Sequence, residues 1–448
     1  MSHRSITRVL LTLGLAAAVP AAAQAPATPG AGARLTSPLS VTLQQRIAAL
    51  EPKVIAWRRD LHEHPELGNR ETRTAAMVAA HLKSLGIEVQ TGVAHTGVVG
   101  LLKGGKPGPV VLLRADMDGL PVTERVDLPF ASKAKATYNG QEVGVMHACG
   151  HDTHVAILMG VAEALAPMRA DLPGTIKFVF QPAEEGPPVG EKGGAELMVA
   201  EGVLANPKVD AAFALHIDAS REIGTIGWSS GAKYASADDF RMVVKGRQTH
   251  GGYPWRGVDP VVASAHIVTA LQTIVARNMN LTENAAVVTV GSIRGGVRSN
   301  IIPESVELLG TIRALDTADR REIHERVRRI ATGVAESMGA AVEVQLPYTT
   351  AYPVTINDGA LLRRVVPVLE AVAGAANVHQ EAPVTGAEDF SFIAEKVPSV
   401  YIGLGGRPRS VKPGASADHH TPDFYIDDSE LDLGVKALTA MALAYMGM

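Results

Sequence analysis

The densest group of chemically active side chains in the sequence lies between Met146 and His154. This segment carries five residues of types that bind metals, namely His147, Cys149, His151, Asp152 and His154. A thiolate together with imidazoles suits zinc and other transition metals of intermediate softness. Such clusters are rare without a metal. The segment therefore predicts a metal centre to which only some of the five residues bind directly.

Two pairs of carboxylates follow apolar runs that read as strands. Asp116 and Asp118 are two residues apart, so on an extended segment they share one side and can bind a metal or orient a ligand histidine. Glu184 and Glu185 are adjacent, and one can bind metal while the other stays free as a base. On an extended segment these two side chains are expected to point in different directions. Taken alone, each pair is also common in a solvated loop.

Three further histidines complete the set. His216 closes the apolar run 211–215, and His419 and His420 stand together in the segment 418–424. Two adjacent histidines point in different directions, so one of them is expected to be a ligand. With the cysteine and the carboxylates there are enough groups for two metals that share a water. Zinc hydrolases use such a site to make hydroxide and to polarise a carbonyl.

A competing motif is the stretch Gly227–Gly231, which matches the serine-hydrolase pattern G-x-S-x-G. That motif requires a strand, a sharp turn and then a helix. Here a polar stretch and another strand follow, so the sequence does not favour a serine nucleophile. The metalloprotease motif HExxH is absent from the sequence.

The elements that must position these residues alternate between strands and helices. This alternation predicts an α/β fold with a mainly parallel sheet, whose site lies at the carboxyl ends of the strands. The expected strands are 110–114, 175–180 and 211–215, and the expected helices are 43–64 with a kink at Pro52, 72–85, one through Val155–Leu165, 360–372 and a last one from Ser429.

A second pattern interrupts the first. Strands at 239–245, 286–293, 305–312 and 341–346 and helices at 260–277 and 319–337 give the order β-α-β-β-α-β, the signature of a ferredoxin-like α+β domain. We therefore expect the catalytic domain in two parts, 43–234 and 348–448, with an inserted domain at 235–347.

The first residues have the pattern of a signal peptide. His3, Arg4 and Arg8 give a positive start, Val9–Val19 is apolar, and Ala21–Ala25 offers two A-x-A cleavage sites. We expect a signal peptide at 1–25, a flexible leader at 26–42 and a periplasmic or secreted mature protein. No other run of about twenty apolar residues appears, so no membrane span is expected.

Composition narrows the class of partner. The net charge is -4 and no long basic block is present, which argues against nucleic acid. Hydrophobic residues make up 46% of the chain, enough for sizeable cores. Cys149 is the only cysteine, so no internal disulfide can form, and its alternative role is that of a buried small hydrophobe.

Taken jointly, four motifs resemble a family of metal-dependent amidohydrolases and exopeptidases. The motifs are RADMDGLP at Arg114–Pro121, HACGHD at His147–Asp152, PAEE at Pro182–Glu185 and H-x-P at His420–Pro422. The family includes hippurate hydrolase, plant auxin-conjugate hydrolases, aminoacylase and carboxypeptidase G, and the hippurate and auxin-conjugate branch is the most similar. The resemblance covers Val54 to the C-terminus. Its one departure in the first motif is Gly119, where alanine is usual.

The resemblance implies roles for individual residues. It implies two divalent metals, zinc first and manganese or cobalt as alternatives, and Glu184 as general base. Asp116 and Asp118 then hold ligands in place. Asp152, His147, His154 and His419 are left without an assigned role, and a structural role is favoured for each. The implied metal ligands are Cys149, His151, Glu185, His216 and His420.

The inserted domain also resembles that of the family, where it forms a lid and the dimer contact. The segment Thr249–Pro254 looks like the family's HAA-x-P, with glycines in place of the two alanines. There the histidine, His250 here, stabilises the oxyanion, often from the neighbouring subunit. Asn300 and Arg313 look like substrate-binding residues, and a guanidinium can pair with a carboxylate bidentately.

The sequence thus predicts a homodimeric enzyme that hydrolyses an amide bond in N-acyl amino acids or small peptides with a free carboxylate. An aminopeptidase or dipeptidase on the same two-metal scaffold is one alternative, which Asn300 and Arg313 disfavour. A non-catalytic metal-binding relative is another, which the presence of Glu184 disfavours.

Overall fold

The computed structural model describes residues 39–349 and 351–448. The predicted signal peptide and most of the predicted leader lie outside these residues. The expected end of the leader, residue 42, is too late, because helix α1 (Val41–Glu63) already begins at Val41. Ser40 caps this helix by accepting a hydrogen bond from the backbone N of Leu43 at 3.2 Å.

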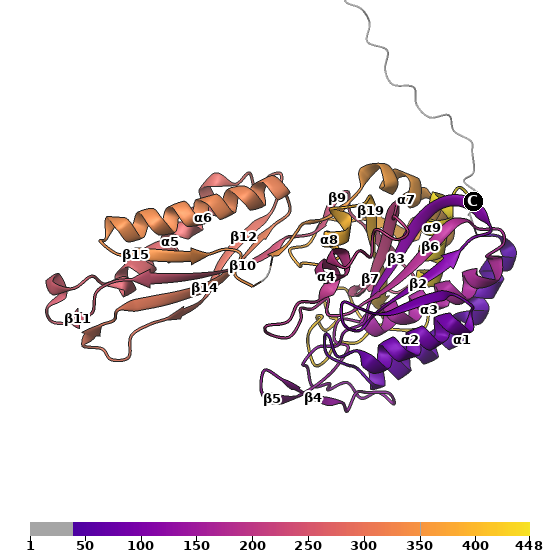
Figure 1. Ribbon diagram of the computed structural model, residues 1–448, viewed down its shortest axis with the longest axis horizontal. Coiled ribbons are helices and arrows are strands. Elements are labelled where there is room, and N and C mark those ends of the chain that lie inside the picture. The colour runs from indigo at the N-terminus through magenta and orange to yellow at the C-terminus, as the bar shows by residue number, and fades with distance from the viewer. Residues whose placement is uncertain (1–38, 350) are drawn as a thin grey trace, which may run out of the picture. The chain divides into compact units, whose positions relative to one another are not determined.

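An eight-stranded mixed sheet positions the site (Figure 1). Its centre is parallel, as predicted, and its β1–β2 edge is antiparallel because a short turn joins these two strands. In spatial order the strands are β1 (Glu88–Val93), β2 (Gly97–Lys103), β6 (Pro173–Gln181), β3 (Lys106–Asp116), β7 (Ala211–Glu222), β19 (Ser399–Arg407), β8 (Ile226–Trp228) and β18 (Val378–Gln380).

Helices cover both faces of this sheet because both faces of its central strands are apolar. In β3, Val111 and Leu113 enter one core and Leu112 enters another, as the two-residue period of a strand requires. Helices in the first core are α1, α2 (Thr72–Ser84), α3 (His151–Leu165), α7 (Gly359–Ala373) and α9 (Asp432–Tyr445). Helices in the second are α4 (Gly194–Ala200) and α8 (Ser391–Ala394).

A five-stranded antiparallel sheet carries a separate core, made of residues between Phe240 and Leu346. Its strand order, β12-β14-β10-β15, is that of a ferredoxin-like fold, with β16 paired to β10, and α5 and α6 run along it in Figure 1. The elements are β10 (Ala237–Lys245), α5 (Pro260–Asn278), β12 (Ala286–Arg294), β14 (Ser305–Ala314), α6 (Thr317–Ser337), β15 (Ala341–Gln345) and β16 (Ala351–Tyr352).

Helix α6 shows why this domain folds as the sequence predicts. Every fourth residue of its inner face is buried, namely Ile323, Val327, Ala331 and Ala335. Asp316 caps it by accepting hydrogen bonds from two backbone nitrogens of the first turn, at 2.7 and 3.0 Å. Within the described residues, α5 is the one helix long and apolar enough to cross a membrane, and its buried stripe lies in the core of this domain.

Three pairs of strands, each two to four residues long, complete the description. Short pairs are β4 (Lys135–Tyr138) with β5 (Gln141–Gly144), β9 (Gly231–Tyr234) with β17 (Thr355–Asn357), and β11 (Thr249–His250) with β13 (Ile301–Ile302). Because β9 follows β8 directly, the stretch Gly227–Gly231 is a strand, a turn and a strand. It therefore lacks the strand-turn-helix geometry of a serine nucleophile, as predicted.

Several expected boundaries were wrong. Strand β7 does not end at Leu215 but runs on to Glu222, because β19 pairs with it beyond that point, so His216 lies inside a strand. Strand β3 already begins at Lys106, and α9 begins only at Asp432. Pro52 lies within α1 without ending it.

Candidate metal centre and active site

The candidate site lies at the carboxyl ends of the central parallel strands. Asp116 is the last residue of β3, Glu184 and Glu185 follow β6, and His216 lies in β7. Cys149 and His151 stand at the start of α3, where Gly150 adopts φ 90°. A glycine favours this left-handed conformation, which lets the chain turn sharply between the two side chains.

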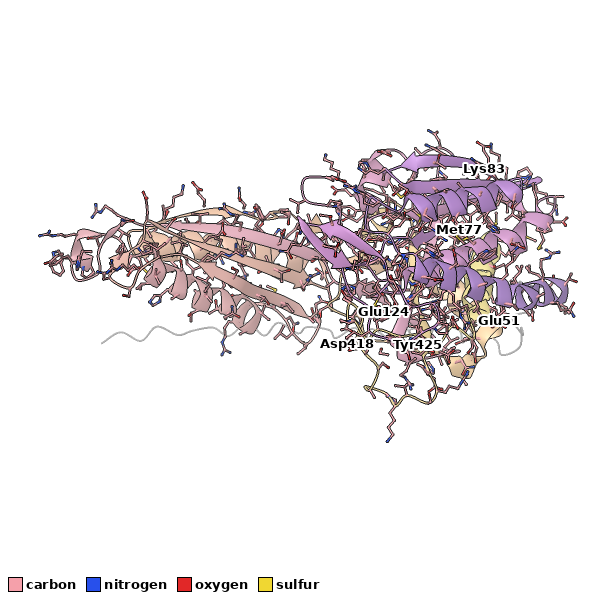
Figure 2. All side chains as sticks on the ribbon, turned by 90° about the horizontal axis from the view of Figure 1, so that it is seen from below. Glu51, Met77, Lys83, Glu124, Asp418 and Tyr425 are labelled. Carbon is pink, nitrogen blue, oxygen red and sulfur yellow. The ribbon has the colours of Figure 1, made fainter. Side chains whose placement is uncertain are left out.

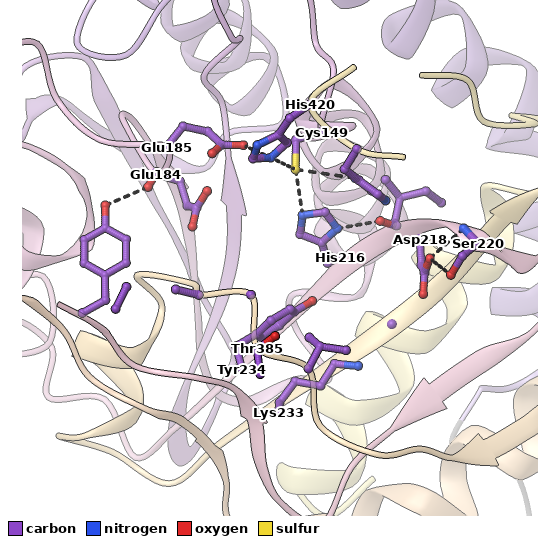
Figure 3. Close-up of a pocket in the computed structure, with 18 of the residues that line it drawn as sticks. Cys149, Glu184, Glu185, His216, Asp218, Ser220, Lys233, Tyr234, Thr385 and His420 are labelled. Atoms are coloured by element: carbon purple, nitrogen blue, oxygen red, sulfur yellow. Dashed lines mark hydrogen bonds and ion pairs between the residues drawn. The ribbon is translucent and has the colours of Figure 1, made fainter. Parts of the chain in front are cut away.

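Cys149 is the meeting point of residues from three distant parts of the chain (Figure 3). Its Sγ atom lies 3.4 Å from Nε2 of His216, 3.3 Å from Nε2 of His420 and 3.6 Å from Nδ1 of His419. Nε2 of His420 also lies 2.9 Å from Oε1 of Glu185. A thiol, imidazoles and a carboxylate in mutual contact form a donor set for a transition metal.

Two histidines each direct their Nε2 atom into this space. Nδ1 of His151 lies 3.2 Å from Oδ1 of Asp118, and Nδ1 of His216 lies 2.5 Å from the carbonyl oxygen of Ile217. Each Nδ1 therefore carries the proton and donates it, which leaves Nε2 as a lone pair. Nε2 of His151 is buried and makes no hydrogen bond among the described residues.

Two other histidines have no lone pair to spare. Nε2 of His154 accepts a hydrogen bond from the backbone N of Ile217 at 2.8 Å, so its Nδ1 donates to Asp116 at 2.5 Å. Nε2 of His419 accepts from the backbone N of Ala219 at 3.2 Å, which leaves Nδ1 to donate toward Cys149. Both rings are therefore suited to support neighbouring groups, not to bind a metal.

Glu184 and Glu185 both approach His151, contrary to the expectation for an extended segment. Nε2 of His151 lies 3.8 Å from Oε2 of Glu184 and 4.0 Å from Oε1 of Glu185. The segment is not extended, because Ala183 adopts φ 51°. The outer contacts still differ. Glu184 Oε1 accepts a hydrogen bond from the backbone N of Asp389 at 3.3 Å, whereas Glu185 reaches His420.

The acidic groups of this cluster are buried close together, an arrangement that a bound cation would stabilise. Burial and the nearby carboxylates of Glu185 and Glu184 raise the pKa of the Cys149 thiol well above its ordinary value. Burial, Glu388 and Glu185 also raise the pKa of Glu184. Together with the unpartnered Nε2 of His151, these groups fit one or more divalent metal ions, which would neutralise the crowded acids.

Of the three residues predicted in the inserted domain, one lines the pocket and two do not. Arg313 lines the same pocket as Cys149 and Glu184, a cavity of about 770 Å³. His250 and Asn300 lie close to each other, because the backbone N of Gly251 donates to the carbonyl of Asn300 at 2.8 Å. Both are exposed, and neither is among the residues that line this pocket.

A comparison with known families identifies the fold and the chemistry together. The model of peptidase family M20/M25/M40 matches residues 112–444. The chain belongs to this family.

Relatives of this M20-family chain are named as a carboxypeptidase and as an amino acid conjugate hydrolase. It is 39% identical to thermostable carboxypeptidase 2 of Saccharolobus solfataricus over 90% of the chain and 98% of that protein. It is 36% identical to the IAA-amino acid hydrolase ILR1-like 2 of Arabidopsis thaliana over 89% of the chain and 87% of that protein. The predicted family is therefore confirmed, and the chain is a metal-dependent hydrolase of this type.

A solved structure supports the same fold. The YxeP protein of Bacillus subtilis, a dinuclear metal-binding peptidase of the M20 family, superposes with a TM-score of 0.74 at 32% identity, covering 89% of this chain and 99% of that one. The predicted α/β fold of the two-metal exopeptidase type is confirmed.

Sequence reasoning missed the buried network behind Glu184 in this M20-family chain. Arg114 donates to Asp116 at 2.5 Å, to Glu388 at 2.8 Å and to Asp389 at 3.1 Å, and all four side chains are buried. Although burial disfavours its charge, these carboxylates hold the pKa of Arg114 well above its usual value. The motif around Arg114 was the only part of this network visible in the sequence, because Glu388 and Asp389 are more than 270 residues away.

Proposed function

We propose that this chain hydrolyses the amide bond of N-acyl amino acids or small peptides that carry a free carboxylate. One observation supports this most directly. The metal-type cluster around Cys149, the carboxylate of Glu184 and the guanidinium of Arg313 all line one pocket. A guanidinium suits a substrate carboxylate, while the cluster suits hydrolysis of the adjacent amide. The names of the carboxypeptidase and IAA-amino acid hydrolase relatives support the same class.

We propose two divalent metal ions, zinc first and manganese or cobalt as alternatives, held by Cys149, His151, Glu185, His216 and His420. The donor set, the unpartnered Nε2 of His151 and the contact of Nε2 of His216 with Sγ of Cys149 support this assignment. When bound, such ions acidify a water and polarise a carbonyl. Asp118 orients His151, while Asp116 and His419 hold their neighbours in place.

Glu184 is proposed to take a proton from the attacking water and to return it to the leaving nitrogen. The backbone N of Asp389 holds one of its oxygens, and its other oxygen faces His151. Burial raises the pKa of Glu184, which favours the protonated form that has to return the proton.

His250 is proposed to stabilise the oxyanion, and Asn300 to bind substrate, from a second copy of the chain in a homodimer. Their exposure at one end of the inserted domain, outside the pocket, supports a role across a subunit contact. Light scattering should give the mass of a dimer. A monomer with full activity would contradict this arrangement.

Export to the periplasm or the medium is likewise proposed, on the signal-peptide pattern of the first residues. N-terminal sequencing of the mature protein should give a start between Gln24 and Pro26. Recovery of the protein from the periplasm with Met1 intact would contradict it.

A panel of substrates tests the reaction class. N-acetyl and N-benzoyl amino acids, dipeptides and dipeptide amides should be assayed with metal-loaded protein. We expect hydrolysis of substrates with a free carboxylate and little hydrolysis of their amides. Preference for a free amino terminus over a free carboxylate would instead support the aminopeptidase alternative. No hydrolysis of any member would support a non-catalytic relative.

A further inference from the structure

One wall of the pocket carries charged groups that the proposed mechanism does not use. Arg221 from β7, Lys233 from β9 and Glu381 from the loop after β18 all line the cavity that also contains Cys149 and His216. Figure 3 shows Lys233 and Tyr234 on the opposite side of this cavity from Cys149 and His216. These groups therefore face a substrate from the side away from the proposed metals.

Two of these side chains are cations that share a single carboxylate. Nζ of Lys233 lies 3.3 Å from Oε2 of Glu381, and Arg221 forms an ion pair with Oε1 of the same residue. The side chain of Lys233 is only 7% exposed and that of Arg221 13%. Nε of Arg221 is buried without a hydrogen bond among the described residues.

The glycine at position 227 leaves space for a carboxylate beside Arg221. A Cβ atom on Gly227 would clash with the carboxylate of Glu381 and with the guanidinium of Arg221, so the glycine leaves room for both. Strand β7 also has a register shift against β19 between Asp218 and Glu222, and Arg221 lies within this irregular stretch. Such irregularities redirect a side chain, which lets Arg221 share the cavity with His216.

The two cations of this wall repel each other. Burial, and then repulsion from Arg221, lower the pKa of Lys233 to about 8, and burial lowers that of Arg221. The other nearby acid, Asp218, places Oδ2 3.9 Å from Nε of Arg221, beyond hydrogen-bond distance, while its Oδ1 accepts hydrogen bonds from Ser220 at 2.6 and 2.8 Å. Nε of Arg221 therefore remains a hydrogen-bond donor from which a further carboxylate could accept.

We propose that Arg221 and Lys233 form a second carboxylate-binding position, so that this enzyme prefers substrates with two negatively charged groups. Glu381 occupies the position in the free protein and leaves it when the second carboxylate of a substrate enters. This inference rests on the proposed function, in which Arg313 binds the first carboxylate. The second carboxylate belongs either to the amino-acid side chain or to a dicarboxylic acyl group.

Two matched pairs of substrates separate these sources. N-acetyl-L-glutamate against N-acetyl-L-glutamine tests the side chain, and N-succinyl-L-alanine against N-succinamoyl-L-alanine tests the acyl group. Each pair differs only in a carboxylate against an amide. Because a hydrogen bond to a charged group contributes more than one to a neutral group, we expect kcat/KM to favour the acid by about tenfold in one pair.

Three variants then assign the preference to this wall. Lys233→Met should lower the acid-to-amide ratio of kcat/KM by about tenfold, since the ammonium is lost. Glu381→Gln should raise the ratio severalfold, because the internal competitor is then neutral. Lys83→Met is the matched control, since Lys83 is exposed on α2 (Figure 2) and should leave the ratio unchanged.

The outcomes separate this inference from the proposed function. Ratios near one in both pairs, with brisk hydrolysis of the neutral substrates, would overturn only the second carboxylate position. An equal decrease in kcat/KM for the acid and for the amide of a pair in Lys233→Met would also overturn only the second carboxylate position. If Lys233→Met does not fold, Glu381→Gln decides alone, and a ratio that stays constant or falls overturns the inference. Absence of hydrolysis with every N-acyl amino acid and peptide would overturn both proposals.

Discussion

Nε2 of His216 lies 3.4 Å from Sγ of Cys149, while Nδ1 of the same ring lies 2.5 Å from the carbonyl of Ile217. The carbonyl belongs to strand β7, so the tautomer and the orientation of the ring are set by the sheet itself. His151 is oriented in the same manner by Asp118. The donors of the candidate metal centre are therefore largely arranged by the fold, without the need for a metal to gather them.

Removal of metal should abolish activity. Dialysis against a chelator should remove the ions, and Zn²⁺, Mn²⁺ or Co²⁺ should restore hydrolysis and raise Tm, because a ligand that binds only the folded state stabilises it. Protein dialysed without chelator is the control. Full activity in protein shown to be metal-free by elemental analysis would refute the two-metal assignment.

The adjacent acids Glu184 and Glu185 should respond differently to the same substitution. Glu184→Gln cannot accept a proton, and kcat should fall by about 10²–10⁴-fold with metal content near that of the wild type. Glu185→Gln should instead lose metal, with partial rescue by added metal. Metal stoichiometry and kcat are measured on both variants. Metal loss in Glu184→Gln alone would mean that the two roles are exchanged.

The adjacent histidines offer a second matched pair. His420→Asn should bind fewer metal ions per chain, since His420 contacts both Cys149 and Glu185. His419→Asn should keep the stoichiometry and weaken metal affinity by about 10–100-fold, as expected for a group that only supports a ligand. Titration with metal followed by elemental analysis measures both effects. Equal loss of metal in the two variants would contradict the assignment from ring tautomers.

Lys177 should make stability depend on pH. Its side chain is buried, donates to the carbonyls of Val203 and Pro207, and has a pKa lowered by burial to about 8. Between pH 8 and the ordinary value of 10.5 the unfolded chain binds more protons, so this residue's contribution to stability rises with pH.

Urea denaturation of wild type and Lys177→Met at pH 7.5 and 9.5 tests this linkage. Relative to the variant, the wild type should gain on the order of 1 kcal/mol at the higher pH. Lys83→Met is again the control and should show no such difference. A constant difference between wild type and Lys177→Met at both pH values would contradict the lowered pKa.

Much of the fold and of the site could be predicted because the signals are local. The buried stripe of α6 lies within one helix, and the segment from His147 to Asp152 is only six residues long, so sequence spacing alone brings the residues of each together. The tautomer of His216 could not be predicted in this way. It depends on β7 continuing as a strand past Leu215, which is decided by pairing with β19 almost 190 residues later.

The directions of the Glu184 and Glu185 side chains are a second feature that the sequence could not predict. Alternation along a strand predicts that neighbours diverge, yet Ala183 turns the chain at φ 51° and both carboxylates reach His151. A positive φ at an alanine has no sequence signature, because glycine is the residue usually found there. Likewise, Glu381 and Arg221 belong to no motif and meet only in the folded chain.

The hydroxyl of Tyr352 donates to the carbonyl of Glu184 at 3.0 Å, and Tyr352 itself pairs with Ala237, the first residue of β10. The loop that carries the proposed base is thus bonded to the strand pair at which the inserted sheet begins and ends. A shift of that strand pair would therefore also act on the loop. Because such coupling is reciprocal, a shift of the loop would act on the strand pair. A substrate that fixed this loop would in turn restrain the root of the ferredoxin-like domain through this phenolic hydrogen bond.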